Sequence, residues 1–128
     1  MDIAGLGTDI VEVTRVAKLL EEFGEHFRQR VCSAEELLLA EKKGGGATFF
    51  AGRWAAKEAA AKALGCGIGK NCALTDISVL NDASGKPELH FSGAAAEMAA
   101  KLRVTAAKVS ISHEVSYAVA TVILCGKD

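Results

Sequence analysis

The chain has 128 residues, half of them hydrophobic, and its 15 basic and 16 acidic residues leave a net charge of −1. This length favours a single domain over residues 1–128. The charge balance excludes a generally basic nucleic-acid binder and a polybasic membrane-surface protein. Because no run of about 18 apolar residues occurs, we expect no membrane span, and the N-terminus lacks the basic stretch of a signal peptide. The four cysteines lack C-x-x-C spacing, which favours reduced thiols in a cytoplasmic protein over a zinc site.

The N-terminal quarter predicts a strand followed by a helix. Residues 3–11 are short, apolar and interrupted by glycines, which is typical of a buried strand, and they carry one acid, Asp9. Apolar residues at helical spacing predict a helix over 15–31, capped by Thr14. Gly24 is a weak point within that helix, because glycine disfavours a helix interior.

Two further helices are expected before the middle of the chain. Ser33 and Glu36 have the spacing of a capping box, which predicts a helix that ends at the glycines 44–46. Residues 48–64 predict the longest helix, since they are mostly good helix formers and Gly65 stands where a helix C-terminus favours glycine.

The second half of the sequence predicts a mostly antiparallel sheet with one inserted helix, so the fold class is α+β. The last strand is apolar on both faces, which places it inside a sheet or an interface. The expected elements are strands over 74–80 and 88–91, a helix over 94–103, and a final hairpin of strands over 108–113 and 117–124.

The long helix carries the first candidate for chemistry. Trp54, Glu58 and Lys62 are spaced by four residues and line one face, whereas Lys57 is turned about 100° away. A Glu–Lys pair at this spacing is often only a surface ion pair worth about 0.3–0.5 kcal/mol. The many neighbouring alanines favour close packing around the pair, and a buried charge must be paired or bind a ligand.

Asp9 is the second candidate, because an apolar strand delivers this one carboxylate. It is either a turn or capping aspartate or, if it meets Glu58, half of a two-carboxylate oxygen site of the kind that Mg²⁺ prefers. His113 ends a strand and is either an ordinary surface residue or a partner for an anion. Lys86 and Pro87 lie in a turn that is a weak candidate for phosphate binding. No Walker A or G-x-G-x-x-G motif is present.

Four segments together resemble the holo-acyl carrier protein synthase family, the small bacterial phosphopantetheinyl transferases. The most specific part is the G-x-D segment ending at Asp9, followed by W-x-x-K-E-x-x-x-K over 54–62. The matching segments are residues 5–15, 50–65, 85–87 and 109–113.

The resemblance implies a reaction and an architecture. The 4′-phosphopantetheine arm of coenzyme A would move to a serine of apo-acyl carrier protein, releasing adenosine 3′,5′-bisphosphate and supporting fatty acid biosynthesis. The implied fold is α+β, with a mostly antiparallel sheet packed against a long central helix, and the implied assembly is a homotrimer with active sites between subunits. Asp9 and Glu58 would hold a magnesium ion.

The resemblance also implies roles for individual side chains. Lys62 would stabilise charge on the phosphates as a catalytic residue, and Glu58, or a metal-bound water that it orients, would take the proton of the carrier serine. The residues expected to contact coenzyme A are Arg53, Lys62, Gly65, Lys86, Pro87 and His113. Two departures from the family pattern are Glu114, an acid directly after His113, and a glycine-rich segment over 42–46 in which Lys43 is the candidate for phosphate binding.

The helix over 15–31 is the expected docking face for the acidic carrier protein. Its basic residues would attract the carrier and its phenylalanines would add apolar contact, although the phenylalanines are equally consistent with a core position. The residues concerned are Arg15, Phe23, Phe27, Arg28 and Arg30.

Two other functions are compatible with the same residues. One is another magnesium-dependent enzyme acting on a phosphodiester, such as a small nuclease, which would hydrolyse its substrate without coenzyme A. The other is a coenzyme A-binding or carrier-binding module without catalytic activity, which would bind without turnover.

Overall fold

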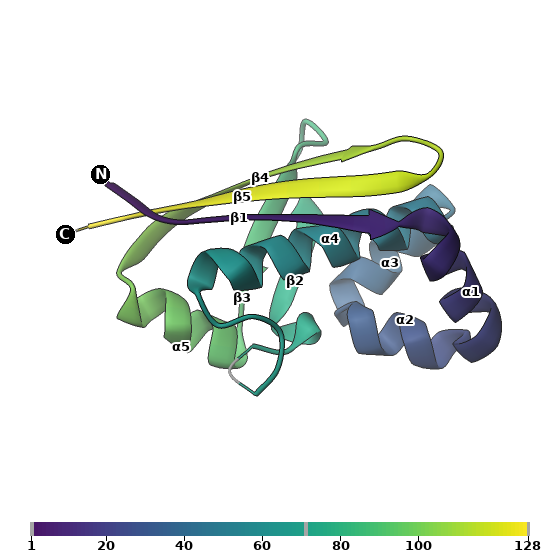
Figure 1. The fold of residues 1–128 in the computed structure, drawn as a ribbon, viewed down its shortest axis with the longest axis horizontal. Coiled ribbons are helices and arrows are strands. Elements are labelled where there is room, and N and C mark those ends of the chain that lie inside the picture. The colour runs from purple at the N-terminus through teal and green to yellow at the C-terminus, as the bar shows by residue number, and fades with distance from the viewer. Residues whose placement is uncertain (1, 71, 128) are drawn as a thin grey trace.

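The computed structural model describes residues 2–70 and 72–127, and its α+β architecture confirms the predicted class (Figure 1). The elements in chain order are β1 (Asp2–Glu12), α1 (Val13–Phe23), α2 (Glu25–Val31), α3 (Ala34–Lys43), α4 (Ala47–Leu64), the short 3₁₀ helix η1 (Leu74–Asp76), β2 (Ile77–Asn81), β3 (Pro87–Phe91), α5 (Gly93–Lys101), β4 (Val104–His113) and β5 (Tyr117–Gly126).

The larger sheet has the antiparallel order β1-β5-β4, so the last strand lies in its centre as expected. Alternate residues of β5 point to opposite faces. Ala118, Ala120, Val122 and Leu124 are buried against the rest of the chain, whereas Tyr117 and Val119 lie on the opposite, exposed face. Both faces of this strand are therefore apolar, as the sequence indicates, but within one chain only the inner face is covered.

Helix α4 lies directly beneath this sheet and forms the centre of the fold (Figure 1). Two glycines of β1 permit the close approach: a Cβ added at Gly7 would lie 1.9 Å from the carbonyl oxygen of Ala59, and one added at Gly5 would lie 2.0 Å from that of Ala63. The alanines of α4 are mostly buried, and two of them, Ala59 and Ala63, lie in this contact. Because Gly5 meets Ala63 and Gly7 meets Ala59, β1 and α4 run in opposite directions.

The predicted helix over 15–31 is wrong as a single element, because it is divided at Gly24. Gly24 has φ +52° and ψ −125°, a conformation outside the helical region, and it separates α1 from α2. The first helix also begins earlier than expected, so Thr14 lies inside α1 and Glu12 is the residue that precedes it. The Thr14 hydroxyl donates to Glu12 Oε1 at 2.7 Å instead of capping the helix.

The other local predictions are closer to the structure. Ser33 and Glu36 form the expected capping box at the start of α3, and α4 ends at Gly65, whose φ is +80°. The strand expected over 74–80 begins with η1 and becomes extended only at Ile77. A second, two-stranded sheet pairs β2 with β3.

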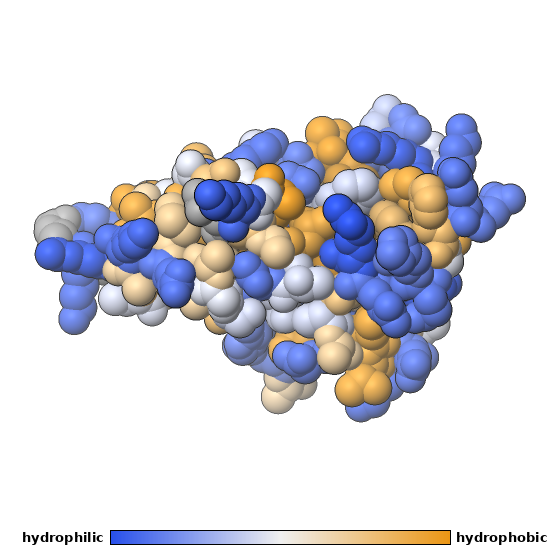
Figure 2. All heavy atoms as spheres, turned by 90° about the horizontal axis from the view of Figure 1, so that it is seen from below, coloured by the Kyte–Doolittle hydropathy of each residue, from blue (hydrophilic) through white to orange (hydrophobic). Residues whose placement is uncertain are grey.

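The molecule has a second face, opposite the three-stranded sheet, which Figure 2 shows as spheres. Hydrophobic side chains lie there between hydrophilic ones, toward the end that carries α1 and α2. Among the described residues, no helix combines the length and apolar character needed to cross a membrane.

Candidate active site

Asp9 and Lys62 meet where β1 packs on α4, and Glu58 lies one turn before Lys62 on the same helix face. Lys62 Nζ donates to Asp9 Oδ1 at 3.0 Å and to the carbonyl oxygen of Thr8 at 2.9 Å. Asp9 lies two residues beyond Gly7 on the same face of β1, which places it beside the turn of α4 that carries Glu58. Glu58 and Lys62 are one turn apart on one helix face, so both face the same side as Asp9. The structure therefore joins Lys62 to Asp9 directly and places Glu58 one turn from Lys62 on the same side of α4.

The donor set of this cluster fits a magnesium ion. Two carboxylates from different elements supply hard oxygen ligands, and Mg²⁺ commonly binds through one or two carboxylates plus waters and substrate phosphates. The Asp9 carboxylate is mostly buried, with 17% of its side chain exposed, whereas Lys62 is 53% exposed. Among residues 2–70 and 72–127, no group of three or more His, Cys, Asp or Glu side chains is placed to hold a metal.

Trp54 extends the same helix face by one more turn. Its indole nitrogen Nε1 donates to Glu58 Oε1 at 3.3 Å. The Arg15 guanidinium lies 5.3 Å from the centre of the indole ring, and the Phe27 ring meets it edge to face at 5.8 Å. Trp54 thus contacts both Glu58 and the helices α1 and α2.

A second group of polar residues, on another face of α4, has the character of an anion site. The Asn81 amide lies between two cations and can accept from one of them at a time: from Arg53 Nη2 at 3.3 Å or, after the amide is turned by 180°, from Lys43 Nζ at 2.8 Å. Burial lowers the pKa of Arg53, although the charge of Glu36 opposes this effect. Arg53 Nε is buried and lacks a hydrogen-bond partner within the described part of the chain, and its guanidinium lies 4.5 Å from the centre of the Phe49 ring.

Of the remaining residues expected to bind coenzyme A, Lys86, Pro87 and His113 lie toward the β4 edge of the sheet, whereas Gly65 does not. Lys86 and Pro87 line a hollow of about 460 Å³ together with residues of β4 and β5. The turn before them is fixed by Asp82, whose Oδ1 accepts from Ser84 N at 2.8 Å and from Lys86 N at 3.0 Å. His113 ends β4, and Gly65 ends α4 at the far end of that helix from Arg53.

The predicted site residues therefore form two clusters. The first, which we call the carboxylate cluster, contains Asp9, Glu58 and Lys62 at edge strand β1. The second, which we call the cationic cluster, is defined by its place toward the opposite edge strand, β4, and not by mutual contacts: it consists of Lys43 and Arg53 beside Asn81, Lys86 next to β3, and His113 at the end of β4. On α4, Arg53 and Glu58 are separated by about 140° around the helix axis.

The predicted carrier-binding residues line two separate hollows. A mostly apolar groove of about 380 Å³ between α1, α2 and α4, which we call the α1–α2 groove, is lined by Arg15, Leu19, Phe23, His26, Phe27, Arg30, Val31, Trp54 and Leu74. Phe27 is buried and belongs to the core. Phe23 is 48% exposed and lies at the surface. Arg28 instead lines a separate hollow between α2 and α3 and pairs with Glu25 at 3.5 Å.

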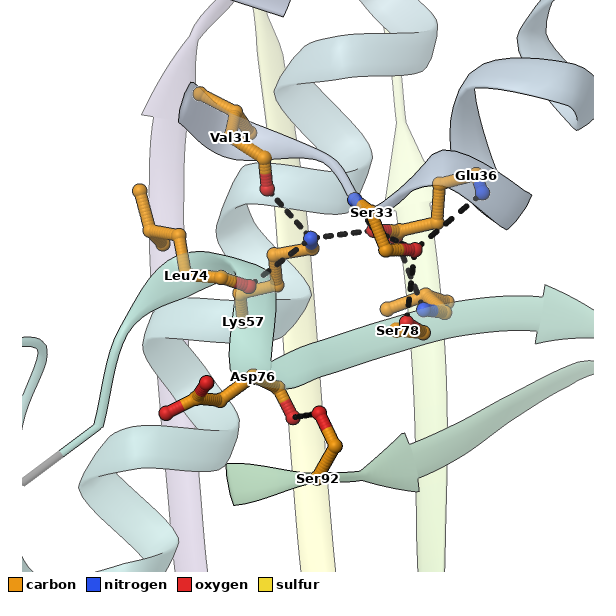
Figure 3. A network of polar contacts seen from close by, with 9 residues as sticks. Val31, Ser33, Glu36, Lys57, Leu74, Asp76, Ser78 and Ser92 are labelled. Carbon is orange, nitrogen blue, oxygen red and sulfur yellow. Dashed lines mark hydrogen bonds and ion pairs between the residues drawn. The ribbon is translucent and has the colours of Figure 1, made fainter. Parts of the chain in front are cut away.

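A buried ion pair beside this groove was missed in the sequence. Lys57 and Glu36 are both fully buried, and Lys57 Nζ donates to Glu36 Oε1 at 2.5 Å (Figure 3). Lys57 Nζ also donates to the carbonyl oxygens of Val31, at 2.5 Å, and Leu74, at 3.1 Å. Glu36 Oε2 accepts from the backbone of β2 at 2.9 Å. The sequence did indicate burial of Lys57, because buried alanines of α4 flank it. It did not indicate the partner, because Glu36 is 21 residues away in the chain.

Cys32 lies near this ion pair and is uncharged. Burial, and after it the charge of Glu36, raise the pKa of the Cys32 thiol to about 12. Cys32 therefore stays protonated and adds no charge to the pair. All four cysteines are free thiols.

Comparison with known proteins places these features in a family. Residues 5–122 match the profile of the 4′-phosphopantetheinyl transferase superfamily. The holo-(acyl-carrier-protein) synthase of Halorhodospira halophila is 52% identical over 122 residues, which are 95% of this chain and 97% of that protein.

Solved structures agree with the sequence comparison. The crystal structure of the holo-(acyl-carrier-protein) synthase from Neisseria meningitidis has a TM-score of 0.89 and 36% identity, covering 96% of this chain and 98% of that one. The synthase from Helicobacter pylori, solved in complex with coenzyme A, has a TM-score of 0.83 and 32% identity, covering 94% and 99%. These likenesses confirm the fold that the sequence resemblance implies.

Proposed function

Because this chain belongs to the 4′-phosphopantetheinyl transferase superfamily, as an enzyme of the holo-(acyl-carrier-protein) synthase family, we propose that it transfers the 4′-phosphopantetheine arm of coenzyme A to a serine of apo-acyl carrier protein. The products are holo-carrier protein and adenosine 3′,5′-bisphosphate, and the process it serves is fatty acid biosynthesis. We further propose that residues 1–128 act as one transferase domain, in the cytoplasm, where its four free thiols remain reduced.

The observation that carries this proposal is the contact of Lys62 with Asp9 where β1 packs on α4, with Glu58 one turn away on the same helix face. Asp9 and Glu58 are the residues that would hold Mg²⁺. When bound there, the ion would supply charge neutralisation at the pyrophosphate of coenzyme A. Lys62, 53% exposed, is free to move its ammonium group from Asp9 to a phosphate oxygen.

The protein groups position the reactants and handle one proton. The carrier serine oxygen forms a bond to the phosphorus next to the pantetheine arm, and the bond from that phosphorus to the bridging oxygen breaks. Glu58, or a water that it orients, is the candidate acceptor for the serine proton, and Trp54 Nε1 engages Oε1 while leaving Oε2 available. Lys62 stabilises the charge that develops on the leaving bisphosphate.

The cationic cluster supplies the groups that would hold the remaining phosphates of coenzyme A. The Arg53 guanidinium contacts the Asn81 amide through Nη2, and Lys43 lies within reach of the same amide. Lys86 and Pro87 border the hollow at β4, and His113 ends that strand. This arrangement supports binding of the 3′-phosphate and adenosine by Arg53, Lys86, Pro87 and His113, with Gly65 near Lys62.

The α1–α2 groove supports docking of the acidic carrier protein. It combines an apolar floor that includes Phe27 and Trp54 with two cations at its border, Arg15 and Arg30. Such a surface matches an acidic partner that also presents apolar side chains. Because Trp54 lies between the groove and Glu58, a carrier seated there would hold its serine near the carboxylate cluster.

A homotrimer is the assembly that we propose. The outer face of the β1-β5-β4 sheet is apolar and uncovered in one chain, with Leu6 65%, Ile10 60% and Val119 36% exposed. An exposed apolar patch of this kind is typical of an interface. The carboxylate and cationic clusters lie toward opposite edges of the same sheet, so packing one copy beside the next would bring one cluster of each together into a complete site.

The direct test is incubation of the protein with coenzyme A, Mg²⁺ and apo-acyl carrier protein, followed by intact-mass spectrometry of the carrier. The expected result is a mass gain equal to the phosphopantetheine arm, located on a serine, together with adenosine 3′,5′-bisphosphate. Hydrolysis of coenzyme A without carrier modification would favour a phosphodiester hydrolase. Calorimetric binding of coenzyme A without any product would favour a binding module.

A further inference from the structure

We propose that Trp54 is a positioning residue for this reaction, which orients Glu58 through its indole N–H while its ring forms part of the carrier-binding surface. The inference rests on the proposed function and adds a residue to it. In consequence, one side chain, Trp54, would contact both the bound carrier protein and a metal-ligating carboxylate.

The first observation concerns Glu58. A glutamate at a helix surface can rotate about its side-chain torsions, and rotation would change which oxygen faces Asp9. Trp54 Nε1 lies one turn earlier on α4 and donates to Glu58 Oε1 at 3.3 Å. Hydrogen-bonded partners of metal-ligating groups fix ligand orientation in this way. The bond commits Oε1 and leaves Oε2 for the site.

The second observation concerns the ring of Trp54. It is held from outside α4 by Arg15, 5.3 Å from its centre, and by Phe27, whose ring lies 5.8 Å away at an interplanar angle of 66°. Both residues line the α1–α2 groove, as does Trp54 itself. A carrier seated in this groove would therefore contact the side chain that holds Glu58.

Two substitutions separate the two functions of Trp54. Trp54→Phe keeps an aromatic ring for the groove but removes the N–H donor. Trp54→Gln removes the ring, but its amide can still donate to Glu58, because residues four apart on a helix are neighbours. A purely structural tryptophan would make both variants fail in the same way.

The metal readout uses Mg²⁺ alone, titrated by calorimetry into the full chain without coenzyme A or carrier. We expect Trp54→Phe to weaken Mg²⁺ binding about tenfold, at the low end of what loss of an outer partner costs a metal site. Trp54→Gln should bind Mg²⁺ almost as the unaltered protein does. Steady-state transfer should show the matching shift in the Mg²⁺ concentration for half-maximal rate.

For the KM of apo-carrier, we expect the larger defect in the other variant, Trp54→Gln. Trp54→Phe should keep the KM for apo-carrier near its original value while kcat falls at limiting Mg²⁺. Trp54→Gln should raise the KM for apo-carrier about tenfold or more, as truncation of a central aromatic anchor does. Thermal melting checks that each variant is folded, and Trp54→Phe alone suffices if Trp54→Gln does not fold.

Trp54 is the single tryptophan of the sequence, so its fluorescence reports both events directly. In the unaltered protein, Mg²⁺ and apo-carrier should each change the emission when added separately. Glu58→Gln should abolish the change caused by Mg²⁺ and keep the change caused by the carrier.

Equal Mg²⁺ affinity in Trp54→Phe and the unaltered protein would overturn the inference while leaving the proposed function intact. Absence of holo-carrier formation by the unaltered protein would instead overturn the proposed function.

Discussion

Lys62 illustrates how one side chain can serve two states of the site. Without substrate its ammonium group neutralises Asp9 at 3.0 Å, and on the proposed function it transfers to the phosphates. Charge stabilisation is most valuable in the transition state, so Lys62→Ala should lower kcat more than it raises the KM for coenzyme A. Initial-rate kinetics with varied coenzyme A measure both, and Lys101→Ala on α5 is a matched control. An effect on KM alone would make Lys62 only a binding residue.

The two carboxylates carry a second prediction at this scale. Asp9→Asn and Glu58→Gln keep the shape of each side chain but remove a charged metal ligand. Each should nearly abolish transfer, with partial recovery at high Mg²⁺ or Mn²⁺, because loss of one of two carboxylates weakens metal binding. Transfer assays across a metal titration check this, and Glu97→Gln on α5 should behave like the unaltered protein. Normal rates of both variants at low Mg²⁺ would place the site elsewhere.

Arg15 tests the proposed docking surface. Arg15→Glu should reduce kcat/KM for apo-carrier, because like charges then face each other at the interface. The loss corresponds to a free energy on the order of 1–3 kcal/mol. The loss should come from slower association and should shrink as salt is raised, while the KM for coenzyme A is unchanged. Lys18→Glu, which makes the same charge change on α1 outside the residues that line the groove, should have a smaller effect. Equal effects of the two variants would contradict docking in this groove.

At the scale of elements, the Lys57–Glu36 pair joins α4 to α3, the end of α2, η1 and β2. Both side chains are fully buried, so removing one charge leaves the other unpaired. Lys57→Met should lower the free energy of unfolding by about 3–5 kcal/mol. Urea denaturation measures this, with Lys101→Met as an exposed control.

The same pair predicts non-additivity. Lys57→Met combined with Glu36→Gln should cost less than the sum of the two single changes, since the double variant no longer buries an unpaired charge. A strictly additive double variant would mean that the two side chains do not stabilise one another.

The elements also show where sequence reasoning works. The capping box of Ser33 and Glu36 is local, and it was predicted from spacing alone and is confirmed. Gly24 was recognised as a weak point, but whether a helix bends or breaks there depends on what its two halves pack against. The contact of Lys62 with Asp9 spans 53 residues and was not predicted, because only a meeting of Asp9 with Glu58 was considered from the sequence. Lys57 and Asn81 were missed because their partners come from packing of α3 and β2 against α4.

At the scale of the whole molecule, the three-stranded sheet separates two groups of residues that the proposed reaction needs in one site. The carboxylate cluster lies at β1 and the cationic cluster lies toward β4, with β5 between these strands. The exposed apolar residues of the outer sheet face, Leu6, Ile10 and Val119, offer a surface through which copies can associate. In a closed ring of three copies, each site would then take one cluster from each of two neighbours.

This arrangement predicts complementation between inactive variants. Asp9→Asn damages the carboxylate cluster and Arg53→Ala damages the cationic cluster, so each homotrimer should be inactive. When the two chains are co-expressed and mix at random, about a quarter of the sites should combine two undamaged clusters and recover activity. Mixing Asp9→Asn with Glu58→Gln is the matched control, because every site then contains a damaged carboxylate cluster. Light scattering of the purified mixture establishes its mass. Recovery of activity in the control, or none in the Asp9→Asn and Arg53→Ala mixture despite trimer formation, would show that each chain carries its site alone.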